Sequence, residues 1–378
     1  MSWSCVICAT PFDNQNFTFL SLVGTITQQV LYHFSKYLSL MANLSDYIIA
    51  TLGSHSALQI LKGAKDEGLR TLCVCEKGRT YPYKSYRVAD EIIEVEHFSD
   101  FFNYESQLIE KKAIMIPHPS LINAIGIQAV SDMQVMYYGS KGICQWEFDR
   151  NMERQWLADA GLALPKLYNS PEEIDRAVIV KFHGAQGGHG YFIARSPSEF
   201  YDRMNEQGNH KKYVIQEYIV GVPVYAHYFY SLLNNELEIM SFDKRYESNA
   251  DSIGRIAAKD QIDANINTSY TITGNIPIVV RESLLTMFFK IGDAVVESSR
   301  KLTTKGLYGP FCLEGVIDTN LNFFVFEISA RIVAGTNLYT RGSPYSWLRY
   351  NEPMSTGRRV AREIKQAIES DRLDLILG

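Results

Sequence analysis

The stretch that decides the fold runs from Phe311 to Ile328 and reads Phe-Cys-Leu-Glu-Gly-Val-Ile, Asp-Thr-Asn-Leu-Asn, Phe-Phe-Val-Phe-Glu-Ile. Two apolar runs joined by a short polar segment predict a β-hairpin. A symmetric hairpin that turns about Asn320 and Leu321 pairs Glu314 with Glu327. We therefore expect the two carboxylates on one face, with Cβ atoms roughly 5 Å apart.

Two like charges on facing strands this apolar repel strongly, and a divalent cation removes that cost. Oxygen-only ligands suit Mg²⁺, which usually takes one or two carboxylates together with substrate phosphates. The sequence therefore predicts a site for Mg²⁺, or for Mn²⁺, on Glu314 and Glu327. The alternative is a hairpin shifted by one residue, which places one glutamate in solvent.

Composition narrows the class of protein. The chain has 378 residues, 46% of them hydrophobic, which is enough for two or three domains. The net charge is −5 and the Lys and Arg residues are dispersed along the chain, so the sequence does not predict a positively charged surface that binds nucleic acid. No apolar run reaches the roughly 18 residues of a membrane span. Six cysteines without disulfide-scaffold density favour a cytoplasmic protein.

The first readable part of the chain is α/β. Residues 47–52 and 69–75 are predicted strands, 57–67 is the helix between them, and a strand at 113–116 leads into a helix from Leu121. Such sheets bind ligands at the carboxyl ends of their strands, where helix N-termini offer N–H groups to phosphate. A phosphorylated small molecule could therefore bind at Ser54, His55, Ser56 and Ser120. Alternatively, the serines are ordinary N-caps.

A second pattern follows. A strand at 177–181 ends in Lys181, and four glycines between 184 and 190 predict a hairpin tip that can approach phosphate oxygens. Residues 213–219 form a predicted strand that carries Glu217 and Ile219 on one face. Further strands are expected at 225–232 and 237–242, and helices at 148–160, 277–301 and 356–370.

This order of elements resembles the ATP-grasp fold. Within it, Gly53–Lys65, Arg245–Asn249, Thr273–Pro277 and Tyr308–Phe311 closely resemble the archaeal formate-dependent FAICAR synthetase family, over about residues 42–378. The resemblance implies a Rossmann-like parallel α/β domain at 41–140, followed by an ATP-grasp domain at 141–378. The latter divides into a Gly-rich hairpin subdomain (141–219) and a metal-binding subdomain (220–378).

The resemblance also implies a reaction. Formate and ATP give formyl phosphate and ADP, and the 5-amino group of AICAR, the aminoimidazole carboxamide ribonucleotide, then takes the formyl group in IMP biosynthesis. It implies an assembly of several copies. Alternatives are a ligase that joins another small carboxylate to an amine, or a paralogue that binds nucleotide without turnover.

The resemblance also implies roles for the residues of this chain that stand at the family's motif positions. Glu314 and Glu327 match the metal ligands, and Glu247 matches an ATP-binding position; Lys181, Glu217 and Ile219 fall where ATP-grasp enzymes hold ATP. His55, Ser120 and Asn275 match AICAR-binding positions. Lys181, with Arg331 as a second candidate, would offset charge during phosphoryl transfer.

Several points stay open at this stage. Lys181 could be a surface strand end and Asn275 a turn residue, while Arg245 and Asn249 could either bind substrate or brace the Glu247 segment. Ser329 stands where many ATP-grasp enzymes carry a metal-binding Asn, so the number of metals is open. Residues 1–40 lie outside the resemblance: either Met41 is the natural start, or they form an amphipathic appendage.

Overall fold

The structure is a computed structural model, and it describes residues 44–182, 191–207, 212–247, 250–264 and 271–378. The chain divides into a unit of residues 1–46, of which only 44–46 are described, and a unit of residues 47–378. The expectations for residues 1–40, for the glycine-rich tip at 183–190 and for Asn249 lie outside the described residues. None of the described helices is long and apolar enough to cross a membrane.

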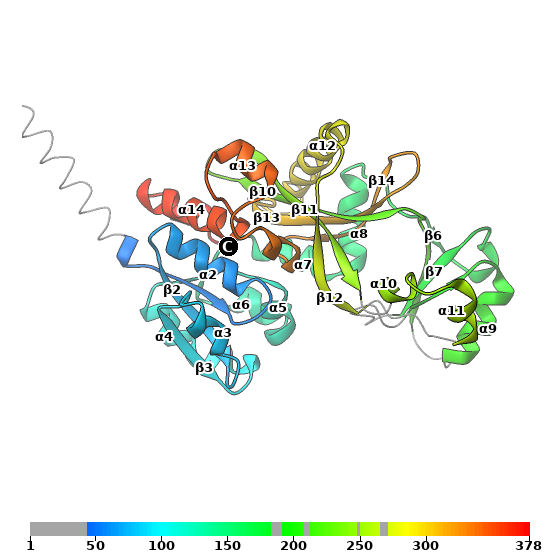
Figure 1. The fold of residues 1–378 in the computed structure, drawn as a ribbon. Helices are drawn as coiled ribbons and strands as arrows, with labels where there is room; N and C mark the ends of the chain where they lie inside the picture. The colour runs from blue at the N-terminus through cyan, green and yellow to red at the C-terminus, as the bar shows by residue number, and fades with distance from the viewer. Residues whose placement is uncertain (1–43, 183–190, 208–211, 248–249, 265–270) are drawn as a thin grey trace, which may run out of the picture. The chain divides into compact units, whose positions relative to one another are not determined.

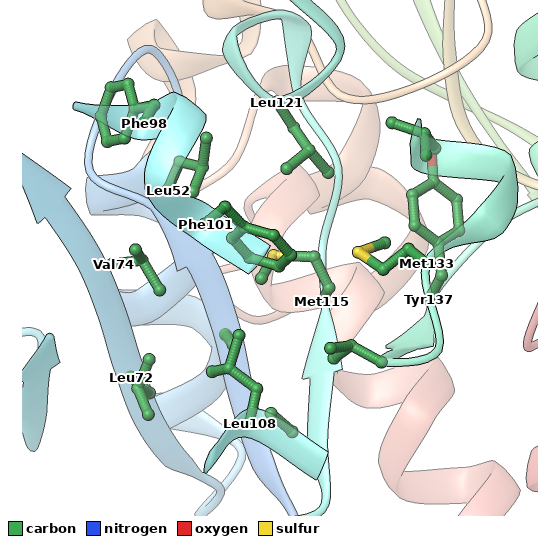
Figure 2. Packing of buried hydrophobic residues seen from close by; sticks show 14 of the residues in the cluster. Leu52, Leu72, Val74, Phe98, Phe101, Leu108, Met115, Leu121, Met133 and Tyr137 are labelled. Atoms are coloured by element: carbon green, nitrogen blue, oxygen red, sulfur yellow. The ribbon is translucent and has the colours of Figure 1, made fainter. Parts of the chain in front are cut away.

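A parallel sheet forms the first part of the larger unit. Its strand order is β3-β2-β1-β4-β5, with bounds β1 Ile48–Leu52, β2 Arg70–Glu76, β3 Glu91–Val95, β4 Ala113–Met115 and β5 Met136–Tyr137. Strand β1 is buried along its whole length, as expected for a parallel strand covered on both faces. Figure 2 shows side chains of this core, where Leu52, Leu72, Val74 and Met115 lie around Phe101. The predicted doubly wound α/β arrangement is confirmed.

Two helices follow the strands that end at the expected binding edge. Helix α2, Ala57–Asp66, begins at the predicted residue. Helix α5, Pro119–Ile125, begins two residues earlier than predicted, because Pro119 fits the first turn of a helix and His118 caps it by accepting from Ser120 N. Ser120 is therefore inside the helix and is not its N-cap. Ser56 occupies the N-cap position of α2, but its side chain makes no capping hydrogen bond.

The C-terminal helix α14, Thr356–Glu369, packs backbone to backbone against α2. A Cβ atom added at Gly63 would lie 2.2 Å from Arg358 N, and one added at Gly357 would lie 2.4 Å from Gln59 O. Only glycine permits this approach. The predicted helix at 356–370 is thus confirmed to within one residue, and it ties the chain's end to the parallel sheet (Figure 1).

A four-stranded antiparallel sheet follows, in the order β6-β9-β7-β8. Its bounds are β6 Leu167–Tyr168, β7 Val178–Phe182, β8 Tyr191–Ala194 and β9 Tyr213–Glu217. Strand β7 carries Lys181 near its end, as predicted, and helix α9, Pro197–Gln207, packs on β8. Strand β9 ends at Glu217, two residues earlier than predicted.

A five-stranded antiparallel sheet completes the fold, in the order β12-β11-β10-β13-β14. Its bounds are β10 Val222–Ser231, β11 Glu236–Glu247, β12 Ile272–Ile278, β13 Gly309–Ile317 and β14 Phe323–Ser329. The prediction of a helix from Pro277 is wrong at its start: α12 runs from Glu282 to Ser299, and Pro277 lies in β12. A proline is tolerated there because β12 is an edge strand. Asn275 lies in the same strand, so its interpretation as a turn residue is also wrong.

The remaining helices connect these three sheets. The bounds of the α-helices are α3 Tyr81–Ser85, α4 Glu105–Glu110, α6 Ile127–Asp132, α7 Lys141–Phe148, α8 Arg150–Asp159, α9 Pro197–Gln207, α10 Ala250–Ile253, α11 Ala258–Asp263 and α13 Pro344–Tyr350. Short 3₁₀ helices are η1 Phe98–Tyr104, η2 Pro171–Glu173, η3 Ala334–Tyr339 and η4 Leu373–Leu375. The predicted helix at 148–160 is observed as α8, which Asp149 caps by accepting from Asn151 N and Met152 N.

Candidate active site

One cavity of about 810 Å³ gathers side chains from all three sheets. Eight of the ten predicted site residues line it: His55, Lys181, Glu217, Ile219, Glu247, Glu314, Glu327 and Arg331. Ser120 and Asn275 do not line it, but each contacts residues close beside it. Residues far apart in the sequence are thus brought together where the prediction placed a single site.

Glu314 and Glu327 are the centre of this cavity. They are direct partners across β13 and β14, as predicted. Glu314 is buried, and burial raises the pKa of its carboxyl to about 7, while Arg245 opposes the rise and Glu327 adds to it. Arg245 Nη2 donates to Glu314 Oε1 over 2.9 Å. The repulsion expected from the sequence is therefore present, and a nearby cation partly offsets it.

These glutamates belong to one row of side chains across the sheet. Glu327, Glu314, Tyr225 and Asp243 stand opposite one another on β14, β13, β10 and β11. Because directly opposite residues in an antiparallel sheet point to the same face, the row forms a continuous polar floor. The Arg245 guanidinium lies over the Tyr225 ring, 4.2 Å from its centroid, which fixes the cation above this floor.

Lys181 reaches the same floor from the four-stranded sheet. Its Nζ lies 5.4 Å from the centroid of the Phe326 ring, beside Glu327. Burial lowers the pKa of the lysine, and the charge of Glu327 raises it in part. The interpretation of Lys181 as a solvent-exposed strand end is therefore wrong, because it lines the cavity.

The outer edge of β14 is held by two buried acids from the helices beneath it. Ile328 N donates to Glu153 Oε1 over 2.7 Å, and Ala330 N donates to Glu147 Oε2 over 3.0 Å. Burial, and then the charge of Glu327, raise the pKa of Glu153 to about 9. These acids satisfy backbone donors that an edge strand would otherwise leave unpaired.

Arg331 follows that edge and is anchored by one of the same acids. Its Nη2 donates to Glu147 Oε1 over 2.8 Å. Burial raises the pKa of Glu147, and the charge of Arg331 opposes this shift. The Nε and Nη1 atoms of Arg331 are buried and have no partner among the described residues. Arg331 thus presents two donors within the cavity wall, which suits an anion.

The cavity is also lined by the three predicted ATP-binding residues Glu217, Ile219 and Glu247. Glu217 accepts from Arg176 Nη1 at 3.1 Å and from Lys166 N at 3.2 Å. Ile219 lies beyond the end of β9 and still faces the cavity, so the prediction that it shares a pocket with Glu217 is confirmed. Glu247 is the last residue of β11 and lies on the same cavity.

At the parallel sheet, Ser54, His55 and Ser120 form a closed polar cluster. Ser120 Oγ lies 2.9 Å from Ser54 Oγ and 3.0 Å from His55 Nδ1. His55 has a φ of 42°, an unusual conformation for a residue with a side chain, and Asn337 Nδ2 donates to its carbonyl at 3.1 Å. Burial lowers the pKa of His55, and Arg331 and Arg245 add to the shift. The two loops therefore meet at the carboxyl edge, as predicted.

Asn275 belongs to a separate hydrogen-bonded group beside the floor. Its Nδ2 donates to Asp243 Oδ2 over 2.6 Å, and its Cα partner across the sheet is Arg245. Asn275 is half-buried on its edge strand.

Sequence reasoning left Arg245 open between binding substrate and bracing Glu247, and it missed Glu147 and Glu153. Arg245 stands two positions before Glu247 on one strand, so strand periodicity could have placed both at the site. Glu147 and Glu153 carry no such signal, because they lie on two short helices separated by a break at Asp149. Among the described residues, no group of three or more His, Cys, Asp and Glu side chains could hold a metal. The glutamate pair therefore supplies two ligands at most, a set that fits a metal completed by phosphate oxygens and water.

Comparisons with known proteins agree with this geometry. Two family models match: a protein of unknown function, DUF1246, at residues 49–168, and a domain of unknown function, DUF1297, at residues 198–378. Among solved structures, the ADP complex of PurK, N5-carboxyaminoimidazole ribonucleotide synthetase, has a TM-score of 0.61 at 13% identity, covering 85% of this chain and 77% of its own. A structure titled as an IMP biosynthesis protein PurP from Thermococcus kodakaraensis has a TM-score of 0.71 at 28% identity, covering 87% of this chain and all of its own. The fold is therefore ATP-grasp.

Curated relatives define the protein family within that fold. The 5-formaminoimidazole-4-carboxamide-1-(beta)-D-ribofuranosyl 5'-monophosphate synthetase of Thermococcus kodakarensis is 53% identical over 336 residues, 87% of this chain and 99% of its own length. The synthetase of the same name from Methanocaldococcus jannaschii is 48% identical over 361 residues, 93% of this chain and 99% of its own. The chain belongs to this FAICAR synthetase family, the ATP-grasp ligases of IMP biosynthesis.

Proposed function

We propose that this enzyme uses ATP and formate to convert AICAR to FAICAR, with Glu314 and Glu327 as ligands of a Mg²⁺ ion. The observation that carries the proposal is the placement of the glutamate pair, Lys181 and Arg331 on one cavity with His55. ATP supplies the phosphoryl group, and the metal, when bound, neutralises phosphate charge. Carboxylate and phosphate oxygens suit Mn²⁺ as well as Mg²⁺, so the proposed site would accept either ion. The free buried thiols Cys73, Cys75, Cys144 and Cys312 suit a cytoplasmic enzyme.

Two different groups of residues bind ATP and AICAR. Glu217, Ile219 and Glu247 hold ATP, with Lys181 on its phosphates. Ser54, His55 and Ser120 hold the AICAR phosphate, where the N-terminus of α2 adds backbone donors. His55 is suited to a neutral hydrogen-bonding role, since burial and both arginines lower its pKa.

Formyl transfer proceeds in two balanced steps. A formate oxygen takes the γ-phosphoryl group, and ADP leaves. The AICAR 5-amino nitrogen then bonds to the formyl carbon, the bond from that carbon to the phosphate oxygen breaks, and phosphate leaves while the amine loses a proton. Arg331 Nε and Nη1 would stabilise the anion formed on the way. Because acyl phosphates hydrolyse, turnover also requires that water be kept from the formyl phosphate.

The test is ADP release from ATP with formate and AICAR, added separately and together. We expect rapid ADP release and FAICAR formation only with both. Equal release with acetate in place of formate would favour a ligase for another carboxylate. Nucleotide binding by calorimetry without ADP release under any condition would favour a non-catalytic paralogue. Size-exclusion chromatography with light scattering tests the expected assembly of several copies.

A further inference from the structure

Asp243 is a fully buried carboxylate at the end of the polar floor. Its side chain has an exposed fraction of 0%, and both of its oxygens are used. Oδ1 lies 2.6 Å from His227 Nε2, and Oδ2 lies 2.6 Å from Asn275 Nδ2. His227 is itself 2% exposed, so this pair is shielded from water. A buried charge with two short hydrogen bonds holds its partners in fixed orientations.

The carboxylate determines which way the Asn275 amide points. A carboxylate oxygen accepts hydrogen bonds, and Asn275 turns its NH₂ group toward Asp243 Oδ2. The amide oxygen, Oδ1, is then directed away from Asp243, and no hydrogen bond among the described residues uses it. Asn275 therefore offers an acceptor, and a ligand at this position must supply an N–H or O–H donor.

A second element connects this group to His55. Gly335, in η3, lies against the carboxylate: a Cβ there would be 2.3 Å from Asp243 Oδ1 and 2.8 Å from His227 Nε2. Two residues later, Asn337 donates to the His55 carbonyl and accepts from Gln59 Nε2 at 2.8 Å. The short helix thus links Asp243, whose partner Asn275 matches an AICAR-binding position, to His55, which holds the AICAR phosphate in the proposed function.

We propose that Asp243 is a positioning residue that makes Asn275 a hydrogen-bond acceptor for an N–H group of the AICAR aminoimidazole carboxamide. The inference rests on the proposed function. His227 fixes the carboxylate, and Gly335 lets η3 close over it. Asp243 acts through Asn275 and does not touch the reacting atoms. The amide orientation favours a base that carries N–H donors over one that carries only acceptors at this position.

The test exchanges the two side chains and measures AICAR and ATP binding by calorimetry. Asp243→Asn frees the Asn275 amide to flip, and Asn275→Asp sets two carboxylates against each other. Each single variant should weaken AICAR binding about tenfold, the loss of one good hydrogen bond, with ATP affinity within about twofold. In the double variant, the amide at position 243 donates to the carboxylate at 275 and still accepts from His227. It should recover AICAR affinity to within about threefold of wild type.

Controls separate positioning from simple damage. Ser241→Ala removes a buried hydroxyl on the same strand that has no partner in the described structure, and it should leave both affinities unchanged. Losses that add in the double variant, instead of cancelling, overturn the inference. If Asp243→Asn loses ATP binding through misfolding, Asn275→Asp and the double variant still decide the matter. Wild-type protein that binds ATP but not AICAR would contradict the proposed function itself.

Discussion

Glu314 and Glu327 face each other because β14 contains a bulge. Near the turn, Ile317 pairs with Phe323 and Gly315 pairs with Val325, a register that would set Glu314 opposite Phe326. One extra residue, Phe326, lies between the Gly315–Val325 pair and the next pair, shifts the register and brings Glu327 opposite Glu314. The pairing predicted from a symmetric hairpin is thus confirmed, but its assumed symmetry is wrong. The bulge also places the Phe326 ring beside Lys181.

Glu327→Gln should abolish Mg²⁺-dependent turnover and leave the fold intact. The amide keeps the size of the side chain but removes half of the anionic pair that would hold the metal. We expect at least a 100-fold fall in kcat/KM at low Mg²⁺, measured by ADP release, with an unchanged melting temperature. Glu369→Gln, on an exposed position of α14, is the matched control. Near-native activity of the Glu327 variant at low Mg²⁺ would rule out the metal assignment.

The parallel sheet and its binding edge could be predicted because strand and helix periods repeat regularly from Tyr47 to Ile125. The two helix starts that were misplaced each involve a proline. Pro119 starts α5 inside an apparent loop, and Pro277 sits in an edge strand although apolar sequence follows it on the way to a helix. At α5 the local cap by His118 sets the start, whereas at Pro277 the placement at the sheet edge overrides the sequence pattern.

The candidate site was predicted only in part, because sequence spacing cannot show contacts between sheets. The ion pair of Arg245 with Glu314 joins strands of one sheet. The two-residue spacing of Arg245 and Glu247 is a periodic sequence signal that could have placed Arg245 at the site. The contacts of Glu147 and Glu153 with β14 join residues about 175 positions apart or more and have none. The family resemblance alone supplied Asn275, whereas the α/β pattern had already indicated Ser120, and neither residue lines the cavity directly.

His55→Ala should weaken AICAR binding about tenfold and leave ATP binding nearly unchanged. The substitution removes the ring that contacts Ser120 Oγ, whereas the proposed ATP-binding residues lie on other strands. Calorimetry with each ligand separately gives the measurement. Ser45→Ala, at an exposed position that is not among the cavity-lining residues, is the control. A variant that loses ATP affinity and retains AICAR affinity would reject the AICAR site.

Arg331→Met should lower kcat at least 100-fold and also destabilise the protein by about 3–5 kcal/mol, because it leaves the Glu147 carboxyl buried without its cation. Adding Glu147→Gln should restore most of the stability, since a neutral amide tolerates burial better. It should not restore turnover. Urea unfolding and ADP release measure the two effects separately. Recovery of activity together with stability would show that Arg331 acts only through the fold.

Glu153→Gln should stabilise the metal-free protein increasingly as the pH rises. The pKa of Glu153 is raised from 4.5 to about 9, so the folded protein retains a proton that the unfolded chain releases. The contribution of the Glu153 proton to the free energy of unfolding is therefore fully present below about pH 4.5. It is lost as the pH rises toward about 9, by up to about 1.4 kcal/mol per pH unit. Glutamine imitates the protonated acid, and its oxygen can still accept from Ile328 N. Urea unfolding at about pH 6, 7 and 8 measures the difference in free energy of unfolding between variant and wild type. Glu110→Gln, at an exposed position, is the control. A gap between variant and wild type that stays constant with pH would mean that Glu153 is ionised in the folded protein.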